Sequence, residues 1–182
     1  MTELEIIAQA VGIVAMCLNI VSFQFKNQKA LIFIQLLVSA LFAVNLLLLG
    51  GMIGGILNII GIFRALVFMF KDKLKSDRPI WLVGFIIVFI TVYILNFAFI
   101  VKDPSTFDYV IELLPVIGMI SLTVGFGLKD SSHTRKCALI NSPAWLVYNV
   151  VIGTWGGIIC EILTIISVFL GMFRHDRAKK HS

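Results

Sequence analysis

The residue with the most chemical potential in this chain is Glu161, an acid inside a run of apolar residues near the C-terminus. A charge at the centre of a membrane helix costs about 2.5–3.5 kcal/mol or more, so such side chains usually face a bundle interior or a water-filled cavity. We expect this carboxyl to accept a substrate hydroxyl, hold a cation or carry a coupling proton. The other interpretation is a structural acid bonded to a neighbouring helix or wetted near the membrane surface.

Five more polar or aromatic residues accompany it within apolar runs: Phe42, Asn45, Asn58, Trp145 and Tyr148. Buried asparagine either binds a ligand or hydrogen-bonds neighbouring helices together. The aromatic rings either stack on a sugar ring and close a gate, or serve as packing and interfacial anchors. With Glu161 they form our candidate substrate-binding set.

Four other residues in apolar runs have plausible local roles. Pro115 and Pro143 remove a helical hydrogen bond each and are candidate hinges, with static kinks as the alternative. Arg64 is expected to snorkel to the cytoplasmic surface, or else to form a gate pair there. Glu112 is expected at the membrane surface or along an outer vestibule.

No catalytic motif is present: the chain lacks G-x-S-x-G, H-E-x-x-H, Walker A and G-x-G-x-x-G patterns. The three cysteines have no metal-binding spacing, and the three histidines are widely separated. We therefore expect no enzyme, no metal and no cofactor. The cysteines are Cys17, Cys137 and Cys160, and the histidines are His133, His175 and His181.

The elements that position these residues follow from composition. Of the 182 residues, 59% are hydrophobic and 14% charged, whereas soluble domains are usually about 25% charged. A membrane helix needs about 20 mostly apolar residues. The sequence predicts an all-α membrane protein with seven transmembrane helices, near residues 5–24, 30–49, 52–70, 80–101, 108–127, 137–153 and 155–173. Glycine turns at Gly50-Gly51 and Gly153-Thr154 would separate two closely spaced pairs.

The basic residues predict the orientation. With seven helices, every lysine and arginine except Lys102 and Arg64 falls in or beside a segment on one side of the membrane. The positive-inside rule makes that side cytoplasmic, with the N-terminus outside and the C-terminus inside. The net charge of +5 then reflects topology, and we expect lipid and a small solute as partners but no nucleic acid.

A shift of 103 residues, which carries residue 58 onto residue 161, aligns the two halves of the chain. Residues 8–76 then overlie 111–179. The shift matches Gly50 with Gly153, and it matches Asn58 with Glu161. We therefore expect one membrane domain over 1–182, in which a first three-helix repeat (5–76) and a second (108–179) are joined by a linker helix (80–101). An odd number of helices in each half, with one linker, makes the two repeats parallel.

The chain resembles the YgjV family of bacterial inner-membrane proteins. The resemblance covers most of the chain and is strongest in ELLPVIG (112–118), WLVYN (145–149), GTWGGIICE (153–161) and ILN (56–58). It implies an inner-membrane location and a multi-pass architecture, without a substrate.

A deeper resemblance is to the SWEET, SemiSWEET and PQ-loop transporters, whose half-repeat carries a tryptophan on its second helix and an asparagine on its third. Phe42 with Asn58, and Trp145 with Glu161, fall at the corresponding places. The Pro-Gln signature is replaced by Phe23-Gln24 and by Phe126-Gly127. This resemblance implies a central site for a sugar or another small solute, reached alternately from each side.

Three functions follow in order of preference. The first is a facilitator or proton-coupled transporter whose site lies between the two triplets. The second is a membrane scaffold or accessory subunit without a pathway, and the third is an intramembrane enzyme. A polar cavity lined by Asn58 and Glu161 would favour transport, whereas a sealed core would favour the scaffold.

Overall fold

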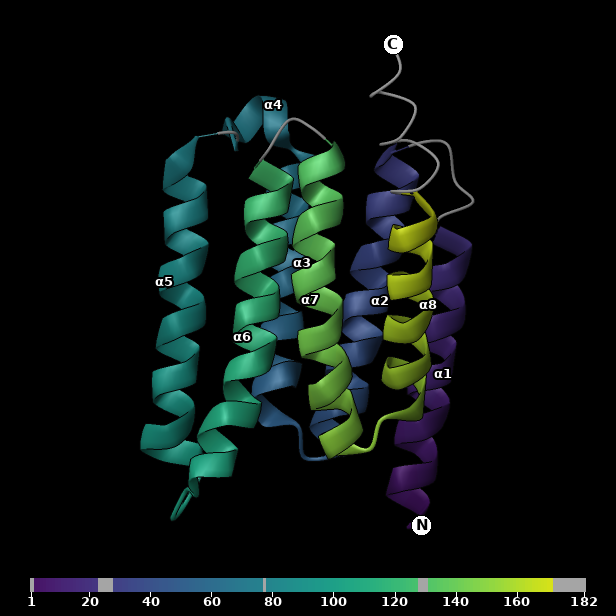
Figure 1. Cartoon of the computed structure of the whole chain (residues 1–182), viewed down its shortest axis with the longest axis vertical. Helices are drawn as coiled ribbons and strands as arrows, with labels where there is room; N and C mark the ends of the chain where they lie inside the picture. The colour runs from purple at the N-terminus through teal and green to yellow at the C-terminus, as the bar shows by residue number, and fades with distance from the viewer. Residues whose placement is uncertain (1, 23–27, 77, 128–130, 172–182) are drawn as a thin grey trace.

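The computed structural model describes residues 2–22, 28–76, 78–127 and 131–171. Within these ranges every regular element is a helix (Figure 1). The seven long helices are α1 (Glu3–Ser22), α2 (Gln28–Leu48), α3 (Met52–Met69), α5 (Pro79–Leu95), α6 (Thr106–Gly127), α7 (Ser131–Ile152) and α8 (Trp155–Gly171). A four-residue helix α4 (Lys71–Leu74) precedes α5, and a π-helix η1 (Asn96–Ile100) follows it.

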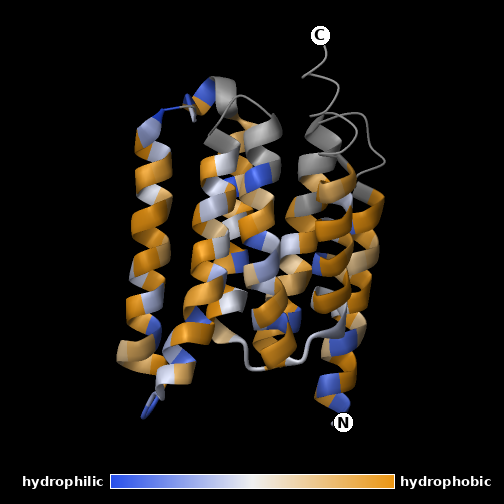
Figure 2. Cartoon of the chain, in the orientation of Figure 1, coloured by the Kyte–Doolittle hydropathy of each residue, from blue (hydrophilic) through white to orange (hydrophobic). Residues whose placement is uncertain are grey.

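The outer faces of the bundle are apolar, as the hydropathy colouring shows (Figure 2). Large hydrophobic side chains on these faces are exposed: Ile80 is 72% exposed, Phe63 61% and Phe99 81%. Within the described ranges, four helices are long and apolar enough to cross a bilayer: Glu3–Val21, Met52–Met69, Pro79–Ile100 and Thr106–Gly125. A helix is suited to the apolar interior of a bilayer because it satisfies its backbone hydrogen bonds internally.

The expected glycine turns are confirmed. Gly50 has φ 85° and Gly153 has φ 78°, a left-handed conformation that glycine adopts without a steric penalty. Each turn also closes its helix with the same long backbone bond, from Gly51 N–H to the Leu46 carbonyl (2.8 Å) and from Thr154 N–H to the Asn149 carbonyl (3.0 Å). Both turns lie at the end of the bundle that carries the N-terminus (Figure 1), called here the N-terminal end.

The helices pack as a ring. Helices that follow one another in the chain pack together: α1 on α2, α2 on α3, α6 on α7 and α7 on α8. Two further contacts close the ring, α3 with α6 and α8 with α1. Helix α5 lies outside, against α3 and α6, at the left edge of Figure 1.

The predicted helix ranges differ from the structure mainly at their polar ends. Helix α7 begins at Ser131 rather than near residue 137, since its first turns are polar and escape a search for apolar runs. The linker span was predicted as one helix over 80–101, and its last turn is the π-helix η1. Helix formation continues past the apolar segment because hydrogen bonding, not hydropathy, determines where a helix ends.

Candidate functional site

Tyr148 on α7 caps the beginning of α3. Its side chain is fully buried, and its hydroxyl oxygen accepts the Gly54 N–H at 3.1 Å. This N–H lies in the first turn of α3, where a helix has no carbonyl of its own to bond. Glycine is required there, because a Cβ at Gly54 would lie 2.5 Å from the Tyr148 ring, and one at Gly51 would lie 3.0 Å from its hydroxyl.

Asn45 on α2 contacts the beginning of α8 through the Thr154 side chain. Its amide nitrogen donates to the Ala8 carbonyl on α1 (2.7 Å), and its carbonyl oxygen accepts the Thr154 hydroxyl (2.6 Å). The same threonine oxygen accepts the Gly157 N–H in the first turn of α8 (3.4 Å). Asn45 thus reaches this helix start through Thr154, and it is fully buried.

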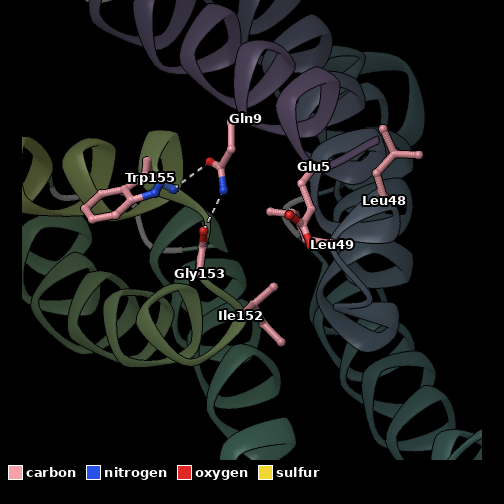
Figure 3. Close-up of a pocket in the computed structure, with 7 residues that line it drawn as sticks. All are labelled: Glu5, Gln9, Leu48, Leu49, Ile152, Gly153 and Trp155. Carbon is pink, nitrogen blue, oxygen red and sulfur yellow. Dashed lines mark hydrogen bonds between the residues drawn. The ribbon is translucent and has the colours of Figure 1, made fainter. Parts of the chain in front are cut away.

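Gln9 on α1 also forms hydrogen bonds with the turn before α8 and with the start of that helix (Figure 3). Its amide nitrogen donates to the Gly153 carbonyl (2.7 Å), and its oxygen accepts the Trp155 N–H at the start of α8 (3.0 Å). A pocket of about 330 Å³ opens beside it, between α1 and the two glycine turns, with the Glu5 and Leu49 side chains on its wall. Gln9 therefore ties α1 to the α7–α8 turn.

Asn58 and Glu161 lie one helical turn further from the N-terminal end. Asn58 follows Gly54 by four residues and Glu161 follows Gly157 by four, so each shares the inward face of its helix with a glycine of the contacts above. Both are half-buried. The Asn58 amide donates to the Gly54 carbonyl on its own helix (2.9 Å).

Glu161 has Ser142 on α7 as its polar neighbour. The Ser142 hydroxyl is near enough to interact electrostatically with the carboxyl but does not meet hydrogen-bond geometry, since this buried oxygen has no bonded partner. Ser142 lies one turn from Trp145 on α7. Helices α3 and α8 are not packed neighbours in the ring, so Asn58 and Glu161 lie on separate walls.

The aromatic members of the set pack in the core. Trp145 is 7% exposed and meets the Tyr148 ring edge-on with centroids 5.8 Å apart. A Cβ at Gly118 on α6 would lie 2.8 Å from the Trp145 ring, so this glycine makes room for it. Phe42, its counterpart under the 103-residue shift, is half-buried on α2.

The snorkelling prediction for Arg64 is wrong. Arg64 is only 7% exposed, and its guanidinium donates to the Met119 carbonyl (3.3 Å) and the Thr123 hydroxyl (3.1 Å) on α6. These acceptors lie across the α3–α6 contact, and they hold the group inside the bundle. Pro115 and Pro143 do lie within α6 and α7. Pro115 is buried and Pro143 is exposed.

Sequence reasoning missed Gln9, Thr154 and Asn149, which are polar residues of the N-terminal end. Asn149 is 4% exposed and adjoins Gly157, where a Cβ would lie 2.7 Å from its amide. One signal was available. Gln9 and Thr154 are hydrogen-bonding residues at the predicted start of α1 and in the α7–α8 turn, and a helix start needs acceptors for its first N–H groups.

The polar groups at the N-terminal end are joined by hydrogen bonds. No group of three or more histidine, cysteine or acidic side chains suited to a metal ion occurs among the described residues. What the N-terminal end offers is a set of neutral donors and acceptors that join one half of the chain to the other. Further inside, an amide and a carboxyl face inward from separate helices.

Comparison with known proteins gives a family. A family model described as Imp-YgjV, bacterial inner membrane protein, matches residues 6–179. No curated protein matches the chain, and no solved structure does.

Proposed function

The chain belongs to the Imp-YgjV family of bacterial inner membrane proteins, and on that premise we propose that it transports a small solute by alternating access between two three-helix repeats. The first repeat comprises α1, α2 and α3, the second α6, α7 and α8, and α5 is the linker. In this proposal all seven long helices cross the membrane. The N-terminal end faces outside, since the basic segments lie at the other end.

Equivalent contacts support the repeat. Under the 103-residue shift, Asn45 corresponds to Tyr148 and Thr154 to Gly51. The contact of Asn45 with Thr154 at 2.6 Å therefore has its counterpart in the close approach of Tyr148 to Gly51. The shift also carries α3 onto α8 and α1 onto α6, so the contact of α3 with α6 and the contact of α8 with α1 are equivalent. Such equivalence is expected of parallel repeats related by a pseudo-two-fold axis.

One observation carries the proposal. The second helix of each half bonds to the start of the third helix of the other half: Tyr148 accepts the Gly54 N–H of α3, and Asn45 accepts the hydroxyl of Thr154, which itself caps α8 at Gly157. Hydrogen bonds of this kind contribute about 0.5–1.5 kcal/mol net, and water replaces them once the helix starts become exposed. Two such contacts make a closure that can open, because each can be broken without dismantling either three-helix unit.

The solute would bind behind this closure. Asn58 and Glu161 lie one turn inward from the two capped starts and present a donor, acceptors and an acid at equivalent places. Trp145, one turn from Ser142 on α7, would supply an aromatic face. This set suits a small polar solute with hydroxyl groups, a sugar among them, because each hydroxyl needs a partner in a dry site.

The alternative is a membrane scaffold without a pathway. Its support is the apolar core, which joins both halves through Leu46, Ile53 and Leu57 on one side and Trp145 with Tyr148 on the other. A scaffold would keep this core sealed at all times. In neither function do we propose a catalytic step.

The deciding experiment measures uptake of a panel of labelled sugars, amino acids and polyols into proteoliposomes that contain the purified chain. Glu161→Gln and Asn58→Leu test the site, and Glu3→Gln is the matched control, because Glu3 is exposed at the start of α1. Transport predicts saturable uptake of at least one solute that both site variants reduce at least tenfold and the control does not. Uptake at the level of empty liposomes for every solute would favour the scaffold.

A further inference from the structure

Glu112 on α6 is a buried acid at the same end of the bundle. It is half-buried as a residue, yet its Oε2 atom is inaccessible and has no hydrogen-bond partner in the described part of the chain. An ionised carboxylate oxygen without a donor is among the most costly groups to bury. The preceding acid differs, since Asp108 accepts bonds from the Ser105 backbone N–H (2.8 Å) and hydroxyl (2.7 Å).

Comparison with the equivalent residue of the other half explains why Glu112 Oε2 has no partner. The 103-residue shift carries Gln9 onto Glu112. Gln9 uses both ends of its amide, donating to the Gly153 carbonyl and accepting the Trp155 N–H. The groups equivalent to these are the Gly50 carbonyl and the Met52 N–H, and they bond to each other at 2.9 Å. An ionised Glu112 would therefore gain no donor from this turn.

Among the residues that the structure describes, no positively charged group interacts with Glu112. Tyr93 on α5 and Tyr148 on α7 lie close enough for electrostatic interaction, and Asp108 on its own helix does as well. On α3 the charged residue is Arg64, which binds α6 at Met119, two turns beyond Glu112 and thus about 10 Å along the helix. Among the described residues, no neighbouring group would neutralise an ionised Glu112, whereas a bound proton would.

We propose that Glu112 is a proton-binding site that couples the closure at Tyr148 to pH; this rests on the transport function proposed above. With the proton bound, the neutral acid tolerates burial and the cap on α3 stays closed. When water enters, the O–H bond of the acid breaks, its electron pair stays on the carboxylate, and the proton passes to water.

Tyr148 provides the link between the acid and the closure. Its oxygen accepts the Gly54 N–H. The closed state buries the Glu112 Oε2 atom without a donor, and opening at Tyr148 admits the water that a carboxylate needs. Proton loss therefore favours the open state, so that the closed fraction is greatest at low pH and declines as pH rises. Gln9, with no proton to lose, gives the other closure no such dependence.

Two measurements on the full chain in lipid test the coupling. Infrared titration follows the carbonyl band of protonated carboxylic acids, and spin labels at positions 3 and 106 follow the separation of α1 and α6 at the N-terminal end. In a Glu161→Gln background, which removes the half-buried acid of α8, we expect a protonated acid band that declines as pH rises, that Glu112→Gln removes and that Asp108→Asn retains. We also expect the open fraction to rise with pH by up to tenfold per unit in the wild type and to be independent of pH in Glu112→Gln.

An unchanged acid band in Glu112→Gln, or an open fraction with the wild-type pH dependence, would overturn the inference. If that variant does not fold, Glu112→Asp replaces it and must shift the midpoint of both titrations. Solute uptake separates the two proposals. Uptake by Glu112→Gln with the wild-type pH profile refutes the proton site while transport stands. A titrating Glu112 in a chain that moves no solute supports the proton site and refutes transport.

Discussion

Replacing Tyr148 with phenylalanine removes one oxygen atom from the closure and leaves the ring packed against Gly54. The Gly54 N–H, now donating to the Tyr148 hydroxyl at 3.1 Å, then has no acceptor in the closed state. A buried donor left unsatisfied costs about 1–3 kcal/mol. In the open state water satisfies it, so the closed state alone bears that cost.

The magnitude follows directly. Since about 1.4 kcal/mol is a factor of ten in an equilibrium constant, the open fraction should rise about 5- to 150-fold. The assay is the rate at which a membrane-impermeant maleimide, added on the outside, modifies Asn58→Cys in a chain without its native cysteines. If opening is rapid, this rate is proportional to the open fraction, and it should rise by the same factor.

Tyr109→Phe is the matched control. Tyr109 is 43% exposed on α6, and it stacks on Phe97 with centroids 4.3 Å apart through its ring. Losing its hydroxyl should leave the modification rate within about twofold, because exposed groups contribute little. Equal rates in Tyr148→Phe, Tyr109→Phe and the parent would refute the role of this hydroxyl in closure.

Three further outcomes are expected. Gly54→Ala introduces a Cβ 2.5 Å from the tyrosine ring and should lower unfolding stability by about 1–3 kcal/mol, measured by denaturation in detergent, whereas Gly84→Ala on α5, with nothing within 4 Å, should be neutral or stabilising. Gly156→Ala places its Cβ against the Gly12 backbone and should cost at least as much, because backbone cannot move aside; an unchanged melting temperature would contradict this packing. Glu161→Gln should abolish or uncouple uptake while membrane yield stays normal, and wild-type uptake across pH would remove this acid from the mechanism.

Much of the fold could be predicted because a bilayer imposes simple rules. Apolar runs of about 20 residues identify helices, and glycine between two such runs marks a turn, as Gly50 and Gly153 both do. The start of α7 at Ser131 and the π-helix at the end of α5 could not be predicted in this way. Neither feature changes the hydropathy of the chain, because both depend on local hydrogen bonding.

For the candidate site, the sequence identifies residues but not their contacts. The 103-residue shift identified Asn45 and Tyr148 as equivalent, and each lies at a closure between the halves. Their hydrogen bonds to the starts of other helices depend on distances between helices that are remote in sequence, which the shift alone does not contain. Arg64 shows the same limit. Its position in the chain suggested the membrane surface, and the acceptors that hold it inside belong to a helix more than fifty residues away.

The most direct test of the account is the distance between spin labels at positions 3 and 106, measured in lipid by pulsed electron resonance. These positions begin α1 and α6, one in each proposed repeat, and neither side chain is buried. Alternating access predicts two distance populations, with the longer one enriched by Tyr148→Phe and the shorter one predominating in the parent chain. A single narrow population, the same in both chains, would contradict it.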